Sequence, residues 1–165
     1  MVRTWIPAAF LVAVAFLGGI SQADEWTVTA LAGTETGVAR VGWRPGGSNV
    51  AIFGQAVWIT DVKEPKTEAL GGHIGAAYDL VKDDPLTILK WTVPVTWYAG
   101  AMAGAVKPED TGWQTSPIVL TGLSFGGKRV RVVLEGWYLP GSSITEAFAN
   151  INDKGRLLVG AELRF

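Results

Sequence analysis

The last part of the chain, residues 155–165, alternates between two kinds of position. In a β-strand every second side chain points to the same face. One face of this segment would carry only uncharged side chains, namely Leu157, Val159, Ala161, Leu163 and Phe165. The other face would carry three charges, on Arg156, Glu162 and Arg164. A strand with one fully apolar face and an aromatic end is typical of a strand that faces lipid and ends at the membrane boundary.

This segment resembles the C-terminal strand of bacterial outer-membrane β-barrel proteins. In that family the assembly machinery reads a glycine, alternating hydrophobic residues and a terminal aromatic as a signal. Gly160, Leu163 and Phe165 match this pattern. Leu158 stands where the family usually has a polar residue. The resemblance implies a small barrel in the bacterial outer membrane, with the assembly machinery and outer-membrane lipids, including lipopolysaccharide, as its partners.

Residues 1–23 have the pattern of a cleavable signal peptide. A positive charge at Arg3 precedes an apolar run and then a few small residues that end at Ala23. The alternative is a transmembrane anchor, but the run contains Pro7 and is shorter than the roughly 20 residues that a spanning helix needs. We therefore expect cleavage after Ala23, which leaves one domain of residues 24–165.

The composition excludes several classes of function. The expected mature segment loses one of the 14 basic residues and keeps all 15 acidic ones, so it has no excess of positive charge for binding nucleic acid. With no cysteine it has neither a disulfide framework nor the usual zinc-finger patterns. The 21 glycines and eight tryptophans fit a β-barrel, in which glycine relieves crowding and tryptophan lies at the membrane interfaces. The sequence gives no indication of the oligomeric state.

After the signal peptide, apolar and polar positions alternate in about eight segments that are separated by turn residues. The expected periplasmic turns are 44–49, 81–85 and 126–128, and the expected outer loops are 33–37, 60–68, 104–112 and 140–154. The fifth segment contains Pro94, which favours a bulge or a protruding hairpin arm there. Short turns on one side and longer loops on the other predict an all-β fold. The expected fold is a single up-and-down antiparallel transmembrane β-barrel with both termini in the periplasm.

Aromatic residues support this topology because they fall near the ends of the expected strands. The periplasmic belt would contain Trp26, Trp43, Tyr78, Phe125 and Phe165, and the outer belt Trp58, Trp97, Trp113 and Tyr138. The alternative is a soluble periplasmic sandwich or lipocalin-like barrel, whose outer faces would be the polar ones. Here the uncharged faces are too extensive to fill one small core, so the membrane barrel is favoured.

The remaining polar side chains are expected to point into the lumen. They are Arg40, Gln55, His73, Asp79, Lys90, Tyr98, Arg129, Arg131, Glu135, Arg156, Glu162 and Arg164. Eight strands enclose a space just wide enough for side chains, and a desolvated charge needs a partner. Because Ile118, Val133 and Leu158 also point inward, we expect a plugged lumen with an ion-pair network. This favours a structural, adhesive or accessory role without a cofactor.

His73, the single histidine, raises the alternative of a lipid-modifying enzyme. It would use His73, Glu135 and a serine from Ser142 or Ser143, as a Ser-His-acid hydrolase does. Some small outer-membrane barrels are lipid A deacylases, whose motif places a serine two residues after the catalytic histidine. Gly75 occupies that position here. We therefore expect a non-enzymatic protein, and one histidine among scattered carboxylates predicts no metal site.

Overall fold

The structure is a computed structural model that describes residues 24–60, 68–88, 90–108, 112–115, 117–139 and 155–165. The strands in this part are β1 (Glu25–Ala32), β2 (Thr36–Arg44), β3 (Val50–Thr60), β4 (Glu68–Ile88), β5 (Trp91–Pro108), β6 (Gln114–Thr115), β7 (Ile118–Gly126), β8 (Val130–Tyr138) and β9 (Gly155–Arg164). The same residues include no helix that is long and apolar enough to cross a membrane. The expected signal peptide, residues 1–23, lies outside the described residues.

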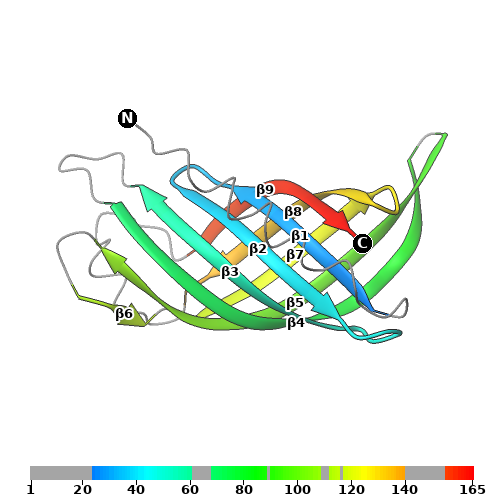
Figure 1. Ribbon diagram of the computed structural model, residues 1–165. Helices are drawn as coiled ribbons and strands as arrows, with labels where there is room; N and C mark the ends of the chain where they lie inside the picture. The colour runs from blue at the N-terminus through cyan, green and yellow to red at the C-terminus, as the bar shows by residue number, and fades with distance from the viewer. Residues whose placement is uncertain (1–23, 61–67, 89, 109–111, 116, 140–154) are drawn as a thin grey trace.

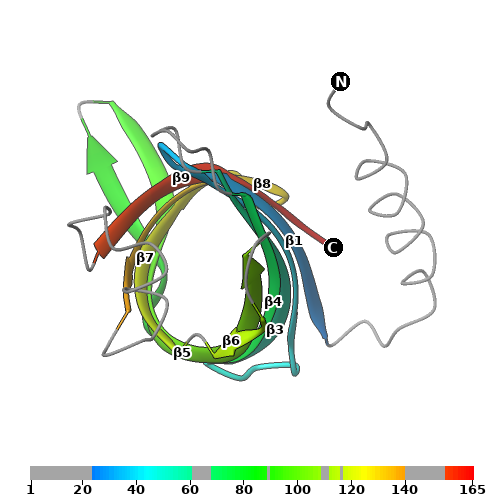
Figure 2. The same cartoon turned by 90° about the vertical axis from the view of Figure 1, so that its left-hand side faces the viewer.

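Antiparallel pairing closes the sheet into a barrel (Figures 1 and 2). Neighbouring strands pair in sequence order, and β1 pairs with both β2 and β9, which joins the two ends of the chain. The two-residue strand β6 pairs only with β5, so eight of the nine described strands form the wall. Closure removes the open edges that a flat sheet would expose. The predicted up-and-down barrel of about eight strands is confirmed.

The two ends of the barrel differ in their connections. We call the end with residues 45–49 and 127–129 the turn end, which lies to the right in Figure 1. The opposite end, which contains the connection between β1 and β2 at residues 33–35, is called the loop end. The start of β1 and the end of β9 lie side by side at the turn end, where the backbone N–H of Phe165 donates to the Trp26 carbonyl at 2.9 Å. The tight turn after β2 requires Gly47, whose φ is +72°.

Alternation along the strands separates an outer face from an inner one. Ile74 and Leu157 are more than 70% exposed on the outside, whereas Val38, Glu135 and Leu158 are fully buried inside. In a soluble protein such an exposed apolar surface would be costly in water, but it is what a wall in contact with lipid needs. The predicted assignment of faces is confirmed for the charged strand β9, where Leu157 points out and Leu158 points in.

The turn predicted at residues 81–85 is wrong. β4 continues to Ile88, β5 begins at Trp91, and the two strands pair along this whole length. The register shifts twice, between Asp79 and Val81 and between Val81 and Asp84, so the turn-like residues form β-bulges instead. The chain then continues as a hairpin, which we call the arm (residues 81–95). This outcome matches the protruding hairpin that Pro94 suggested.

The longer β5 also changes where Trp97 lies. Trp97 pairs with Leu123, two residues from Phe125 at the turn end, so its depth is near the turn end and not at the loop end as expected. The reason is that β5 enters the barrel wall only at Val95 and continues to Pro108. The expected loop 104–112 is shorter for the same reason, since its first residues belong to β5.

Candidate functional site

The centre of the lumen is occupied by an ion pair between β2 and β8. Arg40 donates from its two terminal nitrogens to both carboxylate oxygens of Glu135, at 2.7 and 2.5 Å. Strand alternation places both side chains inward, and the bidentate geometry is the strongest that an arginine and a carboxylate can form. Both side chains are almost completely buried. A pair in this position stabilises the fold only if the remaining polar atoms also have partners.

Further donors complete the shell around Glu135. The phenol of Tyr98 donates to Oε2 at 2.6 Å, and the indole N–H of Trp137 donates to Oε1 at 2.5 Å. The carboxylate therefore accepts hydrogen bonds from three side chains on three strands. Arg40 is held from its own side by Gln55, which accepts from its Nε at 2.9 Å, and by the ring of Phe53, 4.5 Å from the guanidinium carbon.

A glycine makes the contact between Tyr98 and Glu135 possible. Gly122 lies between the two residues, since it pairs with Tyr98 on β5 and with Glu135 on β8. A Cβ built on Gly122 would overlap the phenol of Tyr98. The tyrosine ring thus crosses β7 through the space that a side chain would fill. Any larger residue at position 122 would force the ring away from Glu135.

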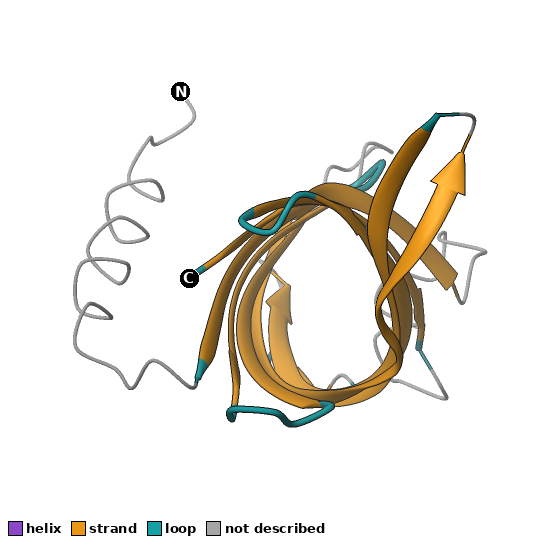
Figure 3. Ribbon diagram, turned by 90° about the vertical axis from the view of Figure 1, so that its right-hand side faces the viewer, coloured by secondary structure: helices purple, strands orange, loops and turns teal. Residues whose placement is uncertain are grey.

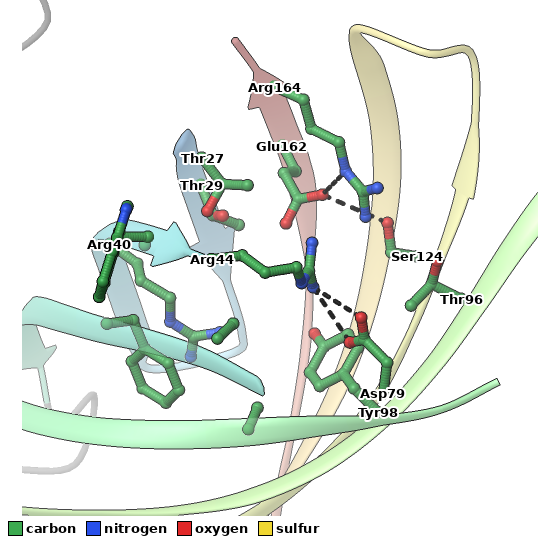
Figure 4. Close-up of a pocket in the computed structure, with 15 residues that line it drawn as sticks. Thr27, Thr29, Arg40, Arg44, Asp79, Thr96, Tyr98, Ser124, Glu162 and Arg164 are labelled. Carbon is green, nitrogen blue, oxygen red and sulfur yellow. Dashed lines mark hydrogen bonds and ion pairs between the residues drawn. The ribbon is translucent and has the colours of Figure 1, made fainter. Parts of the chain in front are cut away.

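A second group of charges fills the turn-end half of the lumen (Figure 4). Arg44 on β2 forms an ion pair with Asp79 on β4 at 2.9 Å and a second one with Glu25. Arg164 on β9 donates to Glu162 at 2.7 Å. The cavity beside these side chains has a volume of only about 40 Å³, which suffices for a few water molecules.

The base of the arm is tied into this charged half of the barrel. Asp83 adopts a φ of +52°, which turns its carboxylate toward Arg131 on β8. The hydroxyl of Thr96 donates to the same carboxylate at 3.1 Å and accepts from Arg131 at 2.9 Å. Partial burial alone would raise the pKa of Asp83, but the guanidiniums of Arg131 and Arg164 keep that pKa below its ordinary value. Asp83 thus remains charged and ties the base of the arm to the barrel wall.

Apolar side chains close the rest of the lumen. The buried cluster contains Leu31, Val38, Phe53, Val57, Ile59, Ala69, Ala77, Met102, Val106, Ile118, Leu120, Val133, Trp137 and Leu158. Its members come from every long strand of the wall, and many of them lie toward the loop end. In the described part of the chain these side chains pack against one another and occupy much of the lumen.

His73 lies within this apolar part and not at an open rim. It is 3% exposed, and the cavity next to it measures only about 20 Å³. The lining of that cavity consists of Val57, Ile59, His73, Val106, Ile118, Trp137, Leu139 and Arg156. Among the described residues this lining includes neither a carboxylate nor a serine. Ser142 and Ser143 lie outside the described residues, and the Glu135 carboxylate is occupied by the donors named above.

Comparisons with protein-family models and with curated protein sequences found no match. Solved structures with a similar fold were found. Neisserial surface protein A is 14% identical, with 86% of this chain and 94% of that one covered, at a TM-score of 0.52. The fold is that of a small outer-membrane β-barrel. A major outer-membrane protein of Thermus thermophilus follows, with 15% identity, 87% and 100% coverage and a TM-score of 0.48. The N-terminal β-barrel domain of OprF from Pseudomonas aeruginosa has 12% identity, 86% and 96% coverage and a TM-score of 0.46.

Within this barrel most of the residues predicted for the lumen do point inward. Those in the interior are Arg40, Gln55, His73, Asp79, Tyr98, Arg131, Glu135, Arg156, Glu162 and Arg164. Lys90 is exposed at the tip of the arm, because the hairpin continues past the barrel wall. Arg129 is exposed in the turn between β7 and β8. These two cations therefore lie outside the lumen, contrary to the prediction.

Three charged residues of the network were not in the predicted set. Arg44 and Asp83 fall within the turns expected at 44–49 and 81–85, and Glu25 precedes Trp26, where the first strand was expected to begin. The signal for Arg44 was present, since it shares the even-numbered inward face of β2 with Arg40 and Gly42. Among the described residues no group of three His, Asp or Glu side chains could hold a metal ion.

The predicted assembly signal lies at the seam where β9 meets β1. Gly160 pairs with Leu31, and a Cβ at this glycine would overlap the backbone of Ala30. Leu163 and Phe165 are 43% and 61% exposed on the outer face. The glycine thus permits close approach of the two strands, while the other two residues offer an apolar surface at the turn end.

Proposed function

We propose that the protein is a structural barrel of the bacterial outer membrane that neither conducts solutes nor catalyses a reaction. The observation that carries this proposal is the filled lumen, in which the Arg40–Glu135 ion pair crosses the interior and apolar side chains close the remainder. All polar atoms of that pair are used in holding strands together. The role is thus to provide a rigid wall, on which loops with an adhesive or accessory task could be carried.

The proposed location rests on three supports. The outer wall is apolar, the chain begins with a signal-peptide pattern, and it ends with the family's assembly motif at Phe165. We propose that both termini lie in the periplasm, so that the turn end faces inward and the loop end faces outward. The corresponding partners are the assembly machinery, lipopolysaccharide and the other outer-membrane lipids.

Conductance measurements test the closed lumen. The purified protein, refolded into planar lipid bilayers, should give no steady single-channel current, because the charged and apolar side chains leave little free cross-section. The control is the double variant Arg40→Ala/Glu135→Ala, which removes the central ion pair but keeps the wall. Small, flickering currents are expected at most from this variant. Large and steady currents from the unaltered protein would overturn the proposal and indicate a channel.

A cellular experiment tests the structural role. Cells that lack the protein should take up more of a large hydrophobic antibiotic or be more sensitive to detergent, and expression of the natural chain should restore the barrier. The variant Tyr98→Phe, which weakens the lumen network without altering the outer surface, should restore it less well. An unchanged barrier together with loss of attachment to host or abiotic surfaces would shift the proposal from a structural to an adhesive role.

A further inference from the structure

The arm is the part of the molecule that the closed barrel does not explain. Its two strands pair with each other but leave the neighbouring strands, since the pairing of β3 ends at Tyr78 and that of β7 at Val95. Figures 2 and 3 show the hairpin extending beyond the circumference of the barrel. The arm thus lies over the region that surrounds the barrel and not over its lumen.

The strand register gives the arm two chemically different faces. Leu86 pairs with Val93, two residues before Val95, which pairs with Phe125 on the outer wall. This outer face of the arm is therefore a direct continuation of the lipid-facing wall. Its outer part is apolar and accessible, with Leu86 47% and Trp91 77% exposed, whereas Asp84, which pairs with Val95, places one carboxylate on the same face at the base of the arm.

The opposite face of the arm is polar. Thr87 pairs with Thr92, and their hydroxyls form a hydrogen bond at 3.0 Å. Pro85 and Pro94 form the next pair on the same face. Prolines on open strands hinder the addition of a further strand, so this hairpin is poorly suited to pair with another polypeptide.

Two contacts fix the direction in which the arm leaves the barrel. At its base, Asp83 is held by Arg131 and Thr96 as described above. Next to it the ammonium group of Lys82 donates to the backbone oxygen of Ser48, in the turn between β2 and β3, at 3.1 Å. The arm is thus attached to the barrel on both sides of its base.

On the proposed orientation, in which the turn end faces the periplasm, we propose that the outer face of the arm docks on the phospholipid leaflet at the turn end of the barrel. Tryptophan is favoured at the boundary between headgroups and acyl chains, and the exposed Lys90 beside Trp91 suits the phosphate groups there. The open backbone edges need hydrogen-bonding partners, which the headgroup layer and its water provide but the hydrocarbon core does not. The apolar side chains thus enter the lipid surface, while Thr87 and Thr92 face the aqueous phase.

The absence of cysteine makes a direct test possible. The single variants Leu86→Cys and Thr87→Cys place a thiol on opposite faces of the arm at almost the same height. Each is labelled with an environment-sensitive fluorophore, and the protein is reconstituted into vesicles of phosphatidylethanolamine and phosphatidylglycerol that contain brominated acyl chains. Leu123→Cys on the barrel wall serves as the lipid-facing control, and Lys128→Cys in an exposed turn as the aqueous control.

The expected result is bromine quenching at position 86 that approaches the quenching at position 123 and is several times that at positions 87 and 128. Adding Trp91→Ser should reduce the quenching at position 86 without changing it at position 123. Water-like, equal fluorescence at positions 86 and 87, with strong quenching at position 123, would overturn the docking proposal alone. Absence of quenching at position 123 as well would contradict the membrane barrel itself, and the docking proposal with it.

Discussion

The phenol oxygen of Tyr98 lies 2.6 Å from a carboxylate oxygen of Glu135, and its ring crosses the neighbouring strand above Gly122. The three residues lie on three consecutive strands of the barrel order, β5, β7 and β8. The contact therefore couples these strands through the lumen as well as through their backbone ladders. Both carboxylate oxygens of Glu135 accept hydrogen bonds, from Arg40, Tyr98 and Trp137 together.

Removing the phenol hydroxyl should weaken this coupling. Tyr98→Phe deletes one hydrogen bond to a buried charge and leaves the ring in place, so we expect a loss of about 1.5–3 kcal/mol in the free energy of unfolding. Denaturant titration of the protein in lipid vesicles measures this value. The matched control is Tyr138→Phe, whose side chain is 49% exposed on the outer face, and its stability should be nearly unchanged. Equal stability of the two variants would contradict the proposed role of Tyr98.

The central ion pair should behave as a unit. Arg40→Ala or Glu135→Ala alone leaves one charge buried without its partner, and each should cost about 3–5 kcal/mol. The double variant should cost clearly less than the sum of the two, because neither charge then remains. A double-mutant cycle from denaturant titrations gives the interaction energy. Additive effects would show that the two side chains do not interact in the folded barrel.

Charge on the outer wall should be tolerated according to its depth. Leu134 lies in the middle of β8 and points outward, so Leu134→Arg places a cation in the hydrocarbon region and should cost about 2–4 kcal/mol. Val130 begins the same strand at the turn end, and Val130→Arg should cost about 0–1 kcal/mol because the guanidinium can reach the headgroups. Stability measurements in vesicles compare the two variants. Similar costs would place the lipid-facing belt elsewhere.

The terminal aromatic should act mainly during assembly. Phe165→Asp keeps the backbone hydrogen bonds to Trp26 but removes the exposed ring, so the folded barrel should lose little stability. Export should continue, while the yield of protein in the outer membrane falls. The measurement is the amount of heat-modifiable protein in outer-membrane and periplasmic fractions. The control is Phe165→Tyr, which keeps an aromatic ring and should assemble normally.

The alternation of side chains was enough to predict the wall and its two faces. Residues such as Arg40 and Glu135 could be placed inside, because their position in the period determines the face. The alternation does not determine how far along the barrel axis a side chain lies or which other side chain it contacts. Arg40 and Glu135, which meet in the lumen, are 95 positions apart in the sequence. Partners of this kind depend on strand tilt and register, which a single strand pattern does not contain.

The arm shows a second limit of the sequence. The residues Lys82, Asp83, Asp84 and Pro85 have the composition of a tight turn, and a turn there would have given a short hairpin. The chain uses them for two bulges instead, because Arg131 and Thr96 bind Asp83 and the alternating residues beyond Pro85 pair again. The decisive contacts are long-range, so local turn propensity alone could not predict the outcome.

The last prediction concerns His73, the residue that any catalytic reading would need. A Ser-His-acid hydrolase requires a nucleophile and an orienting acid within hydrogen-bonding reach of the histidine. The acid predicted for this role, Glu135, already binds Arg40 and two other donors, and the position that carries serine in lipid A deacylases is Gly75. We therefore expect His73→Gln to leave the acylation of lipid A unchanged.

Mass spectrometry of lipid A provides the test, with cells that lack the protein and cells that express the natural chain or His73→Gln. All three samples should give the same acylation pattern, because the small apolar cavity beside His73 has no room for an acyl chain. Ser142→Ala and Ser143→Ala serve as further variants. Loss of one acyl chain with the natural protein, abolished both by His73→Gln and by a serine variant, would instead establish an enzyme.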